Sequence, residues 1–312
     1  MKRASLRTFV WILAMPAVAL AADDPKPREL QIDNVDMHVE LADTQFTRGP
    51  EPILAWIRRS ADIVTHYYGD FPTRRLRIRV QSIDGDGVRG GQTFGRDGGF
   101  IRLRVGRDVT DAQLVDDWVL VHEMIHLALP DVGEEHAWLS EGISTYVEGI
   151  ARAQAGNRTV QDVWFEQFRS MPKGLPQAGD RGLNNTHTWG RTYWGGALFC
   201  LEADVQIHSR THNRFGLQDA LRAVARASGG LSADWPVERV FTTGDQAVGV
   251  RVLEELYAQM KDAPRAPDLD ALWHELGVSP AERSLQLRDD APLADVRKAI
   301  MRPEKRTSSD TP

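Results

Sequence analysis

The chain has 312 residues, and its 44 acidic residues outnumber its 38 lysines and arginines, which gives a formal net charge of −6. Nucleic-acid binding is disfavoured for such a chain, because phosphate contacts need a concentrated basic surface. Cys200 is the one cysteine, so an internal disulfide is excluded and stability must come from a hydrophobic core, for which this length is ample.

The first 22 residues have the pattern of a secretory signal peptide. Three basic residues precede an apolar run, and a small-x-small triplet follows it as a cleavage site. The apolar run is shorter than the roughly twenty residues of a membrane-spanning helix. We therefore expect cleavage near Ala21 or Ala22, no stable membrane insertion afterwards, and a periplasmic or secreted protein. Cleavage would lower the formal charge from −6 to −9.

The next hundred residues mix strand and helix patterns. Residues 23–30 are polar and contain proline, which predicts an extended linker. Alternating side chains predict strands over residues 36–41 and 74–81, and apolar residues at helical spacing predict a helix over residues 50–68. Residues 85–99 are rich in glycine but lack the spacing of a phosphate-binding loop. A further strand is expected directly after them.

The pattern H-E-x-x-H, formed by His122, Glu123 and His126, lies in an apolar stretch that predicts a helix from about residue 110 to residue 129. Residues four apart lie one helical turn above each other, so both imidazoles can reach one ion. A carboxylate beside them can act on metal-bound water, as zinc hydrolases require. The alternative is a surface helix, but three ionisable groups on an apolar face are costly unless they bind something.

Catalytic zinc usually has a third protein ligand, and Glu141 is the best candidate. It lies fifteen residues after His126, and Pro130 and Gly133 supply a break that lets a second helix fold back beside the first. The other candidates lie in the turn itself: Glu134, Glu135 and His136.

The segment around Glu141, W-L-S-E-G-I-S-T-Y-V-E, resembles the W-L-N-E-G-F-A-x-Y-x-E helix of the gluzincin zinc metallopeptidases, which include thermolysin and aminopeptidase N. The match is closest to the aminopeptidase N and glycyl aminopeptidase type. The resemblance implies one zinc ion held by His122, His126 and Glu141, with Glu123 as general base. The spacing departs from the family, because fourteen residues separate His126 from Glu141 where those aminopeptidases have roughly eighteen.

Two further segments bear on this resemblance. Y-W-G-G-A, beginning at Tyr193, resembles the Y-x-x-G-A segment whose tyrosine stabilises the oxyanion, a role that suits a neutral phenol; simple packing is the alternative. Residues 85–99 stand where gluzincins have an edge strand that pairs with substrate, and a flexible hairpin is the alternative. The G-x-M-E-N segment that holds a free amino terminus is absent, since residues 90–94 read G-G-Q-T-F. Strict aminopeptidase action is therefore not predicted.

Beyond residue 150, helical spacing dominates, and a loop over residues 172–189 has a size that often covers a cleft. Helices are predicted over residues 217–227, 247–260, 269–276 and 294–301.

Together these patterns predict an α+β protein with a thermolysin-like zinc-peptidase catalytic lobe, built from a mixed sheet and the H-E-x-x-H helix, and a helical C-terminal lobe. The expected parts are residues 23–106, rich in strands, residues 107–150, which hold the zinc-binding helices, residues 151–302, and a disordered tail over residues 303–312. The predicted function is exported, zinc-dependent hydrolysis of peptide bonds in a peptide or protein substrate. Two alternatives remain open: a catalytically silent binding or assembly protein, and a hydrolase of a non-peptide amide.

Overall fold

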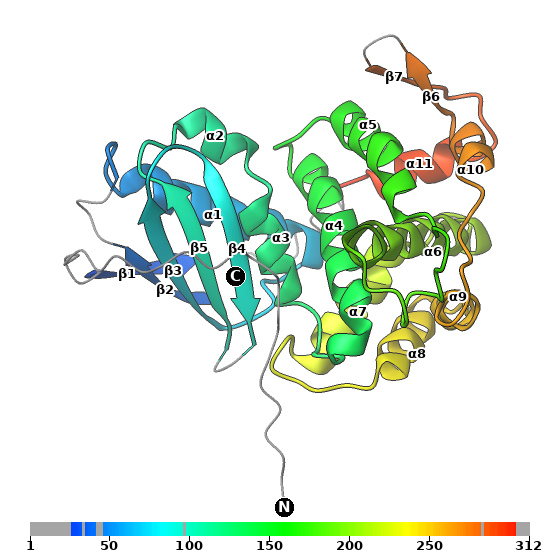
Figure 1. Ribbon diagram of the computed structural model, residues 1–312, viewed down its shortest axis with the longest axis horizontal. Helices are drawn as coiled ribbons and strands as arrows, with labels where there is room; N and C mark the ends of the chain where they lie inside the picture. The colour runs from blue at the N-terminus through cyan, green and yellow to red at the C-terminus, as the bar shows by residue number, and fades with distance from the viewer. Residues whose placement is uncertain (1–25, 33–34, 42–45, 96–97, 282–283, 304–312) are drawn as a thin grey trace, which may run out of the picture.

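The computed structural model describes residues 26–32, 35–41, 46–95, 98–281 and 284–303 (Figure 1). The predicted signal peptide and the predicted tail from residue 304 onward lie outside the described residues. None of the described helices is long and apolar enough to span a membrane.

A five-stranded mixed sheet occupies the first part of the chain, on the left of Figure 1. Its strands lie in the order β1-β2-β3-β5-β4, with β2, β3 and β5 parallel and with antiparallel strands at both edges. Their bounds are β1 (Lys26–Ile32), β2 (Val35–Leu41), β3 (Arg75–Ile83), β4 (Val88–Phe94) and β5 (Phe100–Gly106). The linker predicted over residues 23–30 is wrong from Lys26 onward, because pairing with β2 satisfies the backbone of β1.

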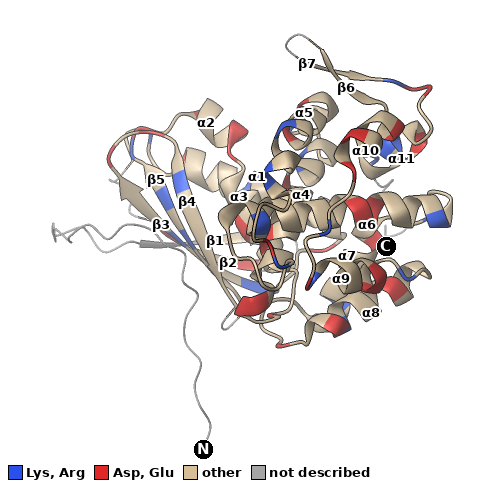
Figure 2. Ribbon diagram, turned by 45° about the vertical axis from the view of Figure 1, so that its right-hand side comes forward, with Lys and Arg blue, Asp and Glu red and all other residues tan. Residues whose placement is uncertain are grey.

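Alternating side chains divide the central strands between a buried and an exposed face. The apolar residues of β3 and β5 belong to the same core as helix α1 (Glu51–Tyr68). Arginines on the other face are solvated, and Figure 2 shows basic residues along these strands. The strand predicted over residues 74–81 and the helix predicted over residues 50–68 are confirmed as β3 and α1.

The helix predicted from residue 110 to residue 129 is broken into α2 (Asp111–Asp116) and α3 (Val119–His126). Thr110 caps α2 with a capping box. Asp117 then has an extended backbone, and its carboxylate accepts a hydrogen bond of 3.1 Å from the Leu120 amide. A side chain that satisfies a free amide starts a new helix, which explains the break.

Helices make up most of the remaining chain, and α4 (Ala137–Gln154) lies beside α3 where the sheet meets the helices in Figure 1. The prediction of one helix over residues 247–260 is wrong: α8 (Val237–Val248) and α9 (Leu253–Met260) divide that region. Asp245 explains the division, because its carboxylate accepts the amides of residues 252–254 and starts α9. Three helices are confirmed, α7 (Leu217–Ser228), α10 (Leu269–Leu276) and α11 (Ala294–Ile300), and a hairpin of β6 (Val278–Ala281) and β7 (Ser284–Leu287) was not predicted.

Two glycines let α4 approach α6 (Gly196–Thr211) at backbone distance. A methyl group at Gly142 would overlap the Cα of Gly196, and one at Gly196 would overlap the carbonyl of Trp138. The π-helical turn η4 (Gly190–Gly195) leads directly into α6 and is therefore held against α4. This contact brings a distant part of the sequence next to residues 138–142. The fold is thus α+β with a mixed sheet and many helices, as predicted.

Candidate metal centre

Helices α3 and α4 bring together the three side chains expected to bind metal. The Oε2 atom of Glu141 lies 3.2 Å from Nε2 of His122 and 3.5 Å from Nε2 of His126. Within the part of the chain that the structure describes, this is the one cluster of three potential ligands whose donor atoms all lie within 4.8 Å of one another. The short connection between the helices therefore does not keep Glu141 away from the histidines.

The turn residues considered as alternatives point elsewhere. His136 in the 3₁₀ turn η2 (Glu134–His136) lies 3.1 Å from the Val132 carbonyl and 3.1 Å from the Tyr257 hydroxyl. Glu134 and Glu135 are exposed. None of the three belongs to the cluster.

The donor atoms fit a zinc ion by spacing and by chemistry. Donors of a tetrahedral zinc site, each about 2.0–2.1 Å from the ion, lie roughly 3.3 Å from one another. The two distances to Glu141, 3.2 and 3.5 Å, agree with this value. Two imidazoles and one carboxylate are a ligand set of catalytic zinc sites, which keep a fourth position for water.

Two serines on α4 contact the Nδ1 atom of His126 and orient its ring. Its Nδ1 lies 2.8 Å from the Ser140 hydroxyl and 3.2 Å from the Ser144 hydroxyl. A proton on Nδ1 that is donated to these oxygens leaves the lone pair of Nε2 directed at Glu141. Such outer hydrogen bonds fix the tautomer and the ring orientation of a metal-binding histidine.

Electrostatics also favour a cation at this cluster. Burial raises the pKa of Glu141, but hydrogen bonds from His122 and His126 outweigh it and hold this pKa well below its ordinary value. Burial lowers the pKa of His126, yet the carboxylates of Glu141 and Glu123 raise it overall. Both shifts indicate a negative potential between the imidazoles, where a metal ion would take the place of protons.

Glu123 lies beside the cluster with 8% of its surface exposed, and strand β4 holds it. The Thr93 hydroxyl lies 2.6 Å from Oε2 of Glu123 and 2.9 Å from its main-chain carbonyl. A Cβ atom at Gly91 would lie 2.5 Å from Cγ of Glu123. Only glycine leaves room for the carboxylate at this point. Within the glycine-rich segment, β4 (Val88–Phe94) is an edge strand of the sheet and contacts α3.

Tyr193 reaches the cluster from η4. Its ring stacks on His122 with centroids 6.3 Å apart, and Trp189 stacks on it at 5.9 Å. Burial, together with the charges of Glu141 and Glu123, raises the pKa of Tyr193 above its ordinary range, so the phenol keeps its proton. π-helical turns are rare in proteins, and those that occur often lie at functional sites. The geometry is compatible with a hydrogen-bond donor next to the metal position.

Several residues of this site were not recognised in the sequence: Gly91, Thr93, Ser140 and Ser144. The serines had a signal, since they stand four apart on the predicted helix and next to Glu141. Thr93 had none, because its contact with Glu123 joins residues 30 positions apart.

Known protein structures include chains with a similar fold. No family model and no curated protein matches the sequence. The structure is similar to an aminopeptidase N family protein from Idiomarina loihiensis, with a TM-score of 0.62, 15% identity, and 82% of this chain and 49% of that chain covered. An M1 zinc metallopeptidase from Deinococcus radiodurans is less similar, with a TM-score of 0.48, 14% identity, and coverage of 78% and 52%. The chain thus spans about half the length of these proteins. The first likeness shows the fold alone.

We expect the purified protein to contain about one zinc ion per chain, as measured by elemental analysis. His126→Ala removes a ligand and should lose most of the zinc. His136→Ala is the matched control, because this histidine lies outside the cluster, and it should keep the metal. Undiminished zinc in His126→Ala would refute the ligand assignment.

Proposed function

We propose that the protein is a zinc-dependent metallopeptidase. The observation that carries this proposal is the place of Glu123: a buried carboxylate next to a cluster of two imidazoles and a second carboxylate, Glu141, that fits zinc. A structural zinc site needs four protein ligands and no neighbouring base, whereas a hydrolytic site needs three ligands and a carboxylate that does not bind the metal. The arrangement here is of the second kind.

The mechanism follows from the residues around the cluster. Zinc, when held by His122, His126 and Glu141, supplies a Lewis acid that acidifies water and polarises a carbonyl group. The Thr93 hydroxyl holds Oε2 of Glu123, and this carboxylate takes a proton from the attacking water and returns it to the leaving nitrogen. The phenol of Tyr193 donates a hydrogen bond to the oxygen that becomes negative.

A peptide is the substrate that suits the surroundings of the site. Strand β4 ends the sheet, so the backbone groups on its outer edge are available to an extended chain. Its glycines allow a close approach, and its inner side lies against α3. The likeness in fold to an aminopeptidase N family protein supports the same class. Export to the periplasm or the medium is part of this proposal and is supported by the leader pattern alone.

Glu123→Gln should retain zinc but lose at least about 100-fold in kcat, since general base catalysis contributes a factor of that order. Elemental analysis and hydrolysis of a peptide pool, followed by mass spectrometry, measure the two effects. An active Glu123→Gln protein would sink the mechanism. Wild-type protein that binds zinc and cleaves no peptide would favour a silent binding protein, or a hydrolase of another amide.

Thr93→Val keeps the size of the side chain but removes the hydroxyl that holds Glu123. We expect kcat to fall about tenfold, as for the loss of other outer hydrogen bonds at metal sites, while KM and zinc content stay close to wild type. Thr93→Ser keeps the hydroxyl and should restore most of kcat. Equal rates for the valine and serine variants would show that the hydroxyl has no part in positioning the base.

The proposed enzyme does not depend on a free amino terminus. Strand β4 has no carboxylate that could pair with an ammonium group, the Gln92 side chain accepts a hydrogen bond from Arg102, and Thr93 is occupied by Glu123. Acetylation of a substrate's amino terminus should therefore change kcat/KM by no more than about threefold, because no charge-assisted contact is lost. Matched acetylated and free peptides provide the measurement, and a loss of about 100-fold on acetylation would contradict this expectation.

A further inference from the structure

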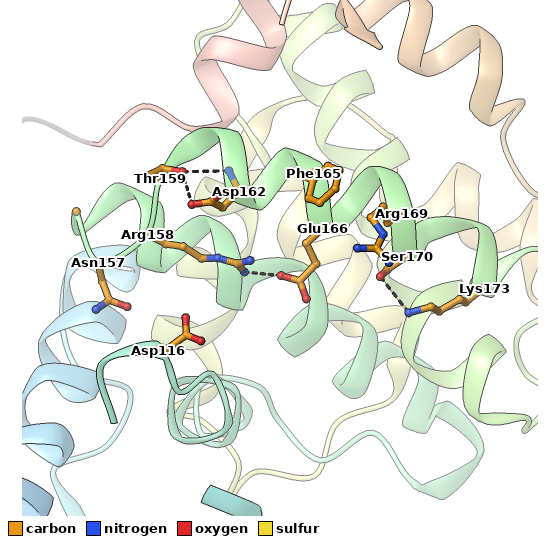
Figure 3. A pocket seen from close by; sticks show the side chains of 11 residues that line it. Asp116, Asn157, Arg158, Thr159, Asp162, Phe165, Glu166, Arg169, Ser170 and Lys173 are labelled. Carbon is orange, nitrogen blue, oxygen red and sulfur yellow. Dashed lines mark hydrogen bonds and ion pairs between the residues drawn. The ribbon is translucent and has the colours of Figure 1, made fainter. Parts of the chain in front are cut away.

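A cavity of about 700 Å³ lies between the end of α2 and helix α5 (Val160–Ser170) (Figure 3). This volume is within the range of roughly 300–1,000 Å³ that ligand pockets occupy. None of the residues discussed above as catalytic or metal-binding lines it. Its walls come from Asp116, from residues 156–159, from one side of α5, and from Lys173.

Two residues of the cavity wall, Asp116 and Lys173, lie close in sequence or in space to aromatic side chains around the metal cluster. Asp116 stands two residues before Trp118, whose ring packs edge-on against His122 with centroids 5.5 Å apart. The Lys173 ammonium lies 6.0 Å from the centre of the Trp189 ring, and Trp189 stacks on Tyr193. Contacts between side chains therefore link two residues of the cavity wall, through Trp118 and Trp189, to the surroundings of the proposed reaction site.

Trp118 and Trp189 mark the path between the two places. They are 53% and 60% exposed, and they are the two exposed aromatic side chains among the described residues. Exposed tryptophans grouped at a site commonly contact a ligand, because a ligand that covers them removes their large apolar surface from water. A chain that runs from the metal centre into the cavity would pack against both rings.

The cavity wall nearest to Trp189 has two cations that no carboxylate neutralises. Among the described residues, Arg169 has no ion pair and lies over the Phe165 ring at 5.4 Å, while Lys173 donates a hydrogen bond of 3.1 Å to Ser170. The two positions are four residues apart, on consecutive turns of the chain from α5 into η3 (Met171–Gly174).

The three carboxylates that line the cavity, by contrast, each have a partner within the protein. Glu166 accepts a hydrogen bond from Arg158, and Asp162 caps the start of α5 together with Thr159. Asp116 lies 4.0 Å from the guanidinium of Arg152. Three acidic and three basic side chains thus line the cavity, and among the described residues Arg169 and Lys173 are its two cations without an ion pair.

We propose that this cavity is a substrate subsite that receives the peptide next to the scissile bond and recognises a carboxylate there, with Arg169 and Lys173 as its counter-charges. This inference rests on the proposed peptidase function. The carboxylate is either an acidic side chain or the C-terminal carboxylate of the substrate, since both present the same group to the two cations.

The test uses a peptide that the zinc-loaded wild-type protein cleaves. Each position from one to four residues on both sides of the scissile bond is made Glu in one peptide and Gln in its partner, and the C-terminus is made as acid and as amide. We expect kcat/KM to be at least about fivefold higher for the carboxylate form at one of these places, as for other charge-assisted contacts. A preference in a Glu/Gln pair indicates an acidic side chain, and one in the acid/amide pair indicates the C-terminus.

In the double variant Arg169→Gln/Lys173→Gln, the ratio between carboxylate and neutral peptides should fall to about one. The double variant Arg58→Gln/Arg226→Gln makes the same change of charge at exposed positions away from the cavity, and it should keep the preference. A preference that survives in the first double variant, or hydrolysis without any preference in the wild type, would overturn the subsite and leave the peptidase proposal intact. Absence of hydrolysis from every peptide would overturn both.

Discussion

The candidate metal centre depends on one contact between two helices, the approach of the Glu141 carboxylate to both imidazoles of α3. Neither helix can place a ligand set alone, because a single helical face offers the two histidines but no third donor at tetrahedral distance. The contact is held from the other side of α4 as well. Gly142, next to Glu141, lies against Gly196 at backbone distance, so α6 limits how far α4 can move away from α3. The same pair of glycines brings η4, and with it Tyr193, to the centre.

A buried ion pair fixes the other end of this arrangement. Arg152 on α4 donates a hydrogen bond of 2.8 Å to Glu148, and its other nitrogens donate to the carbonyl of Asp116 at 3.0 Å and to Asn157 at 2.7 Å. The guanidinium thus joins α4 to the end of α2, just before the break that starts α3. Burial raises the pKa of Glu148 to about 7 even though Arg152 opposes the shift. Because burial of this ion pair costs desolvation free energy, its contribution is to geometry more than to stability. Here it fixes the position of α3 relative to α4.

The sequence predicted the residues of the metal centre better than their support. The cluster of His122, His126 and Glu141 could be anticipated because two of the three donors share a helix and the third lies in a segment with its own pattern. Helix boundaries were missed where an aspartate, such as Asp245, satisfies free amides and starts a helix inside an apolar stretch. Such side-chain hydrogen bonds compete with a helical pattern, and periodicity does not register them.

Strand β4 illustrates the limit of reasoning from a resemblance alone. The resemblance correctly indicated an edge strand, and the missing carboxylate correctly drew attention to residues 90–94. It did not indicate what Thr93 does instead. The hydroxyl lies 2.6 Å from the proposed base, so a side chain of this strand acts on Glu123 instead of on the substrate's end. For the peptidase proposed above, a strand that supports the base but offers no carboxylate to an ammonium group would leave recognition of the substrate to other residues. In the subsite proposed above, Lys173 beside Trp189 and Arg169 one turn before it would supply that recognition, with a charge opposite to the one that an aminopeptidase anchor would use.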